Sequence, residues 1–102
     1  MSYEVTRTIP CDHPSLPGHF PDRPIVPAVV ILDELMGALA EWRPQDYAAK
    51  ISSVKFLTPL EPGQPFVIQF SQREDGDSCD FVCRVGSLSI VQGRLLVRRR
   101  AS

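Results

Sequence analysis

Residues 27–42 read Pro-Ala-Val-Val-Ile-Leu-Asp-Glu-Leu-Met-Gly-Ala-Leu-Ala-Glu-Trp, and this stretch decides the fold. Pro27 suits the start of a helix, where its missing N–H costs nothing, and good helix formers follow without another proline. Apolar residues form a main stripe at helical spacing, made of Val29, Leu32, Leu35, Met36, Leu39 and Trp42. Because Val30, Ile31 and Ala38 extend the apolar character round the circumference, we expect a helix over Ala28–Trp42 that other structure wraps.

The rest of the chain has the alternation of short β-strands. The strand patterns cover Tyr3–Ile9, Lys50–Leu57, Pro65–Arg73, Cys79–Val91 and Arg94–Arg99. Glu61-Pro62-Gly63-Gln64 suits a type II turn and Gln92-Gly93 a tight two-residue turn. The apolar alternation changes phase near Gly86, which we interpret as a bulge that restores the register. One apolar helix and about five antiparallel strands predict an α+β fold in which a sheet curls round the helix.

The bulk properties set limits on the class of protein. A chain of 102 residues builds one core, so we expect a single domain over residues 1–102. The net charge of -1 gives no reason to expect a nucleic acid or a membrane as partner. The sequence shows neither a spanning run nor a signal peptide, which predicts a cytoplasmic protein. We interpret Cys11, Cys79 and Cys83 as reduced packing residues, and the lack of zinc-like spacing predicts no metal site.

A proline-rich segment before the helix carries the most specific motif. Gly18-His19-Phe20-Pro21 precedes the Pro27-Ala28 helix start, and Asp33 lies six positions after Pro27. This arrangement resembles the 3-hydroxyacyl-acyl-carrier-protein dehydratases, whose signature joins Gly-His-Phe-Pro to a Pro-Gly helix start and an acidic residue. The stretches Ser53–Phe56 and Pro59–Gly63 are similar to the family's second strand and following turn. The resemblance covers nearly the whole chain and implies a hotdog fold, an antiparallel sheet wrapped around one long central helix.

The resemblance also implies a reaction, the removal of water from 3-hydroxyacyl thioesters on acyl carrier protein to form trans-2-enoyl thioesters. His19 is then the base and Asp33 the acid, because a neutral imidazole accepts a proton and a carboxyl buried in an apolar helix keeps one. The Ala28 N–H, unpaired at the helix start, is the implied oxyanion donor. Further substrate-binding positions are Gly18, Phe20 and Pro27. No cofactor is implied.

Assembly and alternatives follow from the same likeness. Family members generally take the two catalytic residues from different protomers, which implies a homodimer, and carry a cis peptide that here would be His19-Phe20. Arg98-Arg99-Arg100, with Arg94 and Lys55, is a candidate patch for the acidic carrier protein. Ala28 departs from the family's glycine and adds a methyl group beside the thioester. A hotdog thioesterase and a non-catalytic acyl-binding or carrier-binding module therefore remain alternatives.

Overall fold

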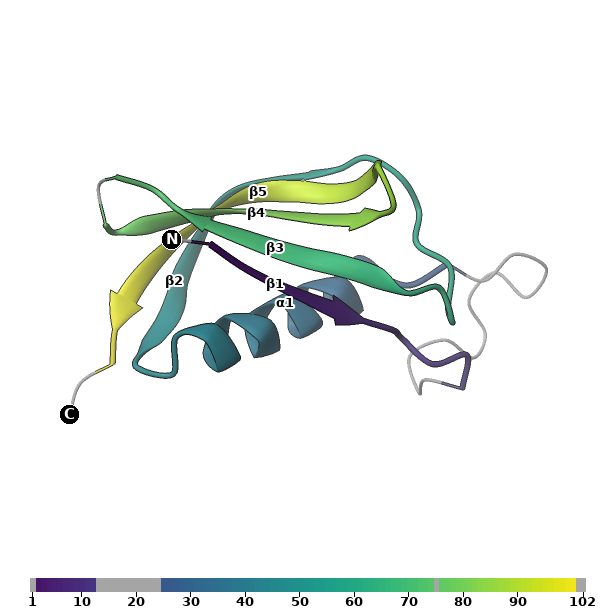
Figure 1. Cartoon of the computed structure of the whole chain (residues 1–102), viewed down its shortest axis with the longest axis horizontal. Coiled ribbons are helices and arrows are strands. Elements are labelled where there is room, and N and C mark those ends of the chain that lie inside the picture. Colours follow the sequence, from purple (N-terminus) through teal and green to yellow (C-terminus); the bar gives the residue numbers. More distant parts are fainter. Residues whose placement is uncertain (1, 13–24, 75, 101–102) are drawn as a thin grey trace.

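The computed structural model describes residues 2–12, 25–74 and 76–100, which form one helix and one sheet. The elements in chain order are β1 (Ser2–Arg7), α1 (Ala28–Trp42), β2 (Asp46–Phe56), β3 (Phe66–Gln72), β4 (Ser78–Val85) and β5 (Leu88–Arg99). The strand order is β1-β3-β4-β5-β2, and every neighbouring pair is antiparallel. Figure 1 shows α1 lying along one face of this curled sheet. The expected α+β hotdog architecture is confirmed.

Helix α1 begins and ends at the residues that the sequence predicts. The side chains that it buries against the sheet are Val30, Ile31, Leu35, Ala38 and Leu39. The expected stripe was wrong at Val29, whose side chain is 70% exposed. An apolar pattern that extends round a helix does not tell which side the sheet covers, and within one protomer the sheet covers only one. No helix in the described part of the chain is long and apolar enough to cross a membrane.

The core lies between α1 and the inward side chains of the strands. Phe66, Ile68 and Phe70 of β3 are buried, as the alternation predicts. Cys79 and Cys83 of β4 are buried, free thiols in the same layer. Burial raises the pKa of Cys83 to about 12 and that of Cys79 to about 11. Both thiols therefore stay protonated at neutral pH and act as the packing residues expected.

The hairpin turn between β4 and β5 differs from the predicted one. Val85 pairs with Leu88, so Gly86-Ser87 forms the two-residue turn, and Gly86 has a positive φ of 59°. The predicted turn at Gln92-Gly93 and the bulge at Gly86 were wrong. A change in phase marks either a bulge or a reversal of the chain, and only the pairing of the strands distinguishes them.

The start of β2 was also misplaced, because this strand begins at Asp46 instead of Lys50. Register shifts against β5 fall between Ala48 and Lys50 and between Ile51 and Ser53. Each shift interrupts the two-residue period on which the prediction depends. Strand β2 is therefore longer than predicted, and it is an edge strand of the described sheet, where it pairs with β5.

Gly93 is required at the middle of β5 because its neighbours leave no space for a side chain. A Cβ there would lie 2.1 Å from the Ser53 carbonyl oxygen and 2.8 Å from the Phe81 ring. We expect Gly93→Ala to lower the free energy of unfolding by about 2–4 kcal/mol, since β5 must separate from β2 or from the core. Gly37→Ala is the matched control, because apart from its own helix backbone nothing in the described chain lies within 4 Å of the added methyl group. Urea denaturation of both variants measures the difference, and equal stabilities would contradict this account.

Candidate functional site

The N-terminus of α1 opens into an apolar hollow of about 330 Å³. Pro27 is the N-cap residue, with extended backbone angles and no side-chain capping bond. The hollow is lined by Ile25, Val26, Ala28, Ile31, Phe56, Leu57, Thr58, Pro59 and Leu60. Its volume lies at the lower end of the range of small-molecule sites, and its walls suit an acyl chain.

Backbone hydrogen bonds hold the walls of this hollow together. The Val26 N–H donates to the Leu60 carbonyl at 2.8 Å, which ties the segment before α1 to the segment after β2. The Leu57 N–H donates to the Ile90 carbonyl at 2.8 Å and thereby fixes the end of β2 against β5. The segments before α1 and after β2, distant in sequence, are therefore held side by side by paired backbone groups.

The electrostatics of the hollow come from the helix end. The first amides of α1 bonded within the described chain are those of Val30 and Ile31, which both donate to the Pro27 carbonyl. The N–H groups of Ala28 and Val29 have no acceptor among the described residues. No acidic residue occupies the first turn to neutralise the positive end of the helix dipole. A developing oxyanion beside Ala28 would therefore meet an unpaired donor next to a low-dielectric wall.

Asp33 lies on the outward face of α1, one turn after Val29, and its side chain is exposed in the protomer. The expectation that the helix buries this carboxyl is wrong within one protomer, because the sheet covers the opposite face. Asp33 forms no ion pair or hydrogen bond with the other described residues and does not line the hollow at Ala28. It is therefore free to meet a group from outside the protomer.

Its neighbour Glu34 is held by a different contact. The Arg7 guanidinium of β1 lies 3.5 Å from a Glu34 carboxylate oxygen and also pairs with Glu41. These contacts draw Glu34 toward the β1 side of the helix. Of the two adjacent acids, Glu34 is paired and Asp33 has no partner among residues 2–12, 25–74 and 76–100, which supports the choice of Asp33.

The remaining predicted site residues are not placed. Gly18, His19 and Phe20, together with the implied cis peptide, lie outside the described residues. The structure places Ala28 in the lining of the hollow, with Pro27 directly before it as the N-cap residue, and leaves Asp33 on the exposed face of α1. The wall formed by Phe56, Leu57 and Leu60 was not predicted from the sequence. Two consecutive apolar residues at the end of a strand, followed by Thr-Pro, are the signal that could have indicated it.

The basic residues proposed for carrier docking lie at two different places. The Arg100 N–H donates to the Gln45 carbonyl, just after the C-terminus of α1. Arg98–Arg100 therefore lies about 20 Å from Ala28, the length of the helix. Lys55 precedes Phe56 on β2, next to the hollow. Because side chains alternate along a strand, Lys55 points to the opposite face of the sheet from Phe56 and does not line the hollow at Ala28.

A single curled sheet around one helix defines the hotdog class, and the apolar hollow at the uncapped helix start is suited to acyl groups. A chain of the dehydratase heterocomplex ApeI:P from Xenorhabdus doucetiae has the same fold, with a TM-score of 0.82 and 23% identity over 96% of this chain and 88% of that one. Residues 1–94 match the ApeI-like family, described as ApeI dehydratase. The chain therefore belongs to the ApeI-like dehydratase family.

The curated relatives are longer than this chain. The chain is 30% identical to the 3-hydroxyacyl-[acyl-carrier-protein] dehydratase FabZ of Verminephrobacter eiseniae over 76 residues, 64% of this chain and 51% of that protein. It is also 30% identical to FabZ of Agrobacterium fabrum over 86 residues, 76% of this chain and 56% of that protein. The chain spans about half the length of the curated relatives it matches.

Proposed function

We propose that this protein dehydrates 3-hydroxyacyl thioesters carried on acyl carrier protein, without a cofactor, in the cytoplasm. The observation that carries the proposal is that α1 starts without a side-chain cap and that its first residue, Ala28, lines an apolar hollow of acyl dimensions. Family membership and the names of the FabZ relatives support the reaction class. The carrier-bound substrate comes from those names and not from the geometry.

The chemistry divides between two side chains and one backbone group. His19 removes the proton from the carbon next to the thioester carbonyl, and the Ala28 N–H stabilises the negative charge that develops on the carbonyl oxygen. As the double bond forms, the C–O bond to the 3-hydroxyl breaks, and the Asp33 carboxyl donates the proton that releases it as water. His19 ends protonated and Asp33 ionised, so one proton transfer between them restores the starting state.

A homodimer supplies what one protomer lacks under this proposal. The carboxyl of Asp33 points outward, and β2 ends the sheet with a free edge. Val54 and Phe56 on that strand are 41% and 46% exposed, and Val29 is exposed on the neighbouring helix. We infer from the family resemblance that a second copy covering these apolar groups supplies the His19 that acts with Asp33. An imidazole from one protomer would thus complete the site of the other.

Phe56→Glu tests this assembly. The charge would be buried unpaired between two copies. We therefore expect the dissociation constant of the dimer to rise at least about 100-fold. Leu88→Glu is the control, because Leu88 is an exposed apolar residue at the β4–β5 hairpin, beyond Val91, the residue of β5 that pairs with Phe56. Sedimentation velocity of both variants gives the association state. If the unaltered protein sediments as a monomer, the homodimer is wrong.

The reaction itself is tested with a 3-hydroxyacyl carrier protein and the full chain. We expect absorbance at the enoyl thioester band to rise while no free thiol is released. Release of free thiol in place of enoyl product would assign the chain to the thioesterases. Binding of the acyl carrier without either product would leave a non-catalytic module, and both outcomes reject the dehydratase proposal.

A further inference from the structure

A second hollow, of about 540 Å³, lies on the face of the sheet that points away from α1. Phe81 is buried beneath α1, so its neighbours Asp80 and Val82 point to the opposite, outer face. Cross-strand pairing places the side chains around the hollow in two rows. One row runs Ser71, Asp80, Arg94 and Ser53, and the next runs Gln69, Val82, Gln92 and Lys55. We refer to this feature as the outer-face hollow.

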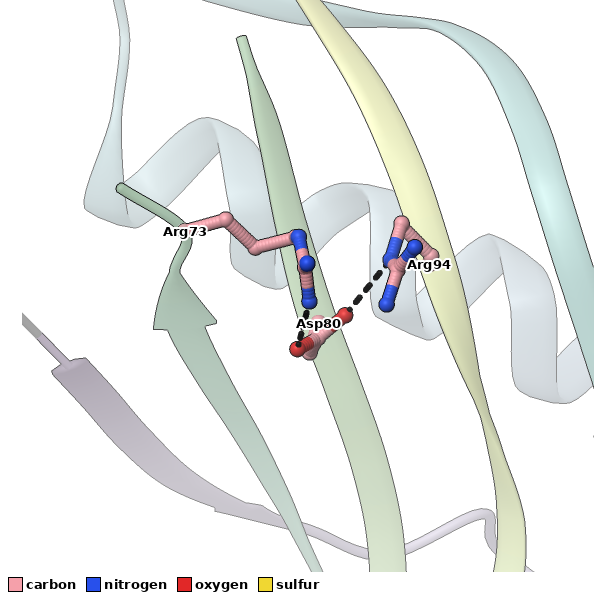
Figure 2. A network of polar contacts seen from close by, with 3 residues as sticks. All are labelled: Arg73, Asp80 and Arg94. Atoms are coloured by element: carbon pink, nitrogen blue, oxygen red, sulfur yellow. Dashed lines mark hydrogen bonds and ion pairs between the residues drawn. The ribbon is translucent and has the colours of Figure 1, made fainter. Parts of the chain in front are cut away.

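A carboxylate holds two arginines at the border of the outer-face hollow. Asp80 accepts a hydrogen bond from Arg94 Nε at 2.9 Å through one oxygen and from Arg73 Nη1 at 3.1 Å through the other (Figure 2). The hydrogen bond from Arg94 is the first cause of the lowered pKa of the Asp80 carboxyl. The carboxylate therefore stays ionised and keeps both arginines bound at neutral pH. The bridge holds the two guanidinium groups in defined positions instead of leaving them to sample many rotamers.

The contacts between Asp80 and the two arginines leave hydrogen-bond donors available for a ligand. Arg94 uses Nε for Asp80, and its two terminal nitrogens form no hydrogen bond with the described residues. Lys55 is exposed and forms no ion pair with them either. Two arginines contact Asp80 and Lys55 lines the same hollow, although the chain as a whole carries a net charge of -1. The outer-face hollow is therefore a positive site on a slightly negative protein.

The available groups favour a phosphate. Arg94 offers a planar fork and Lys55 a compact point charge, a combination that matches the several acceptor oxygens and double charge of a phosphate. The Ser53 hydroxyl and the Gln92 amide line the same hollow and can bind polar groups beside it. The volume lies within the range of small-molecule sites, which favours a small ligand over a flat protein surface.

We propose that the outer-face hollow binds a phosphate-bearing small molecule, with Arg94 and Lys55 as its charged contacts. This site is separate from the hollow at Ala28, because the two lie on opposite faces of the sheet. The proposal does not depend on the dehydratase reaction.

Inorganic pyrophosphate is the probe, titrated into the full chain by calorimetry at low ionic strength. We expect saturable binding, which Arg94→Gln and Lys55→Gln each weaken at least about tenfold by removing a charged hydrogen bond. Arg98→Gln is the matched control, since Arg98 lies four residues further along β5 and does not line the hollow. It should change the affinity less than about twofold. Thermal unfolding of each variant verifies that it is folded.

Three outcomes would overturn the proposal. If the titration with pyrophosphate gave no saturable heat, the proposed site would not exist. An equal loss of affinity in Arg98→Gln would show that pyrophosphate binds through the general positive charge of the strand and not at a defined site. Binding of a polyglutamate peptide without binding of pyrophosphate would assign the surface to an acidic protein. None of these results depends on whether the chain forms an enoyl product.

Discussion

Asp33→Asn is expected to lower kcat for dehydration by about 10²–10⁴-fold while leaving the free energy of unfolding within about 0.5 kcal/mol of its original value. Asparagine keeps the shape of the side chain but has no proton to give to the departing hydroxyl. Stability should be retained because Asp33 is exposed in the protomer and bonded to none of the other described residues. Steady-state kinetics and urea denaturation together separate the catalytic effect from a folding defect.

Glu34→Gln provides the comparison on the adjacent position. It breaks the ion pair with Arg7, and because both side chains are partly exposed the loss should be at most about 1 kcal/mol of stability. We expect kcat to stay within about twofold of the original value. If Glu34→Gln were inactive and Asp33→Asn active, Glu34 would be the catalytic acid and the assignment to Asp33 would be wrong.

Ala28→Pro is expected to lower kcat by about 10²–10³-fold, because proline removes the N–H that we propose as the oxyanion donor. The first position of a helix accepts proline readily. Pro27 already has the extended backbone, with ψ 147°, that a residue before proline prefers. Circular dichroism should therefore show an intact helix, and the same kinetic assay measures the lost donor.

Ala28→Gly is the matched substitution, since it keeps the donor and removes only the methyl group. We expect kcat/KM to rise several-fold if that methyl crowds the thioester at the edge of the hollow. Should Ala28→Pro retain full activity, the oxyanion donor would have to be another group, and the proposed site would need to be moved.

The local features of this protein could be predicted from its sequence. Helix α1 has the predicted bounds because its start and end depend on neighbouring residues, Pro27 at one end and Arg43-Pro44 at the other. The turn at Glu61–Gln64 is likewise confirmed, with Gly63 at a positive φ of 81° and the Gln64 N–H bonded to the Glu61 carbonyl. The motif also indicated Ala28 as a wall of the site. Caps and tight turns are determined by the few residues that form them.

Other features depended on contacts between distant segments. In the sequence, Gln92-Gly93 is typical of a tight turn. In the structure, Gly93 lies in the middle of a strand, where Ser53 and Phe81 pack against it. The motif spacing pointed to Asp33, but only the fold shows that its neighbour Glu34 pairs with Arg7 of β1. The walls of the hollow come from segments joined by the bond between Val26 and Leu60. Sequence period determines which residues share a face, but only the packing of one element on another determines what that face meets.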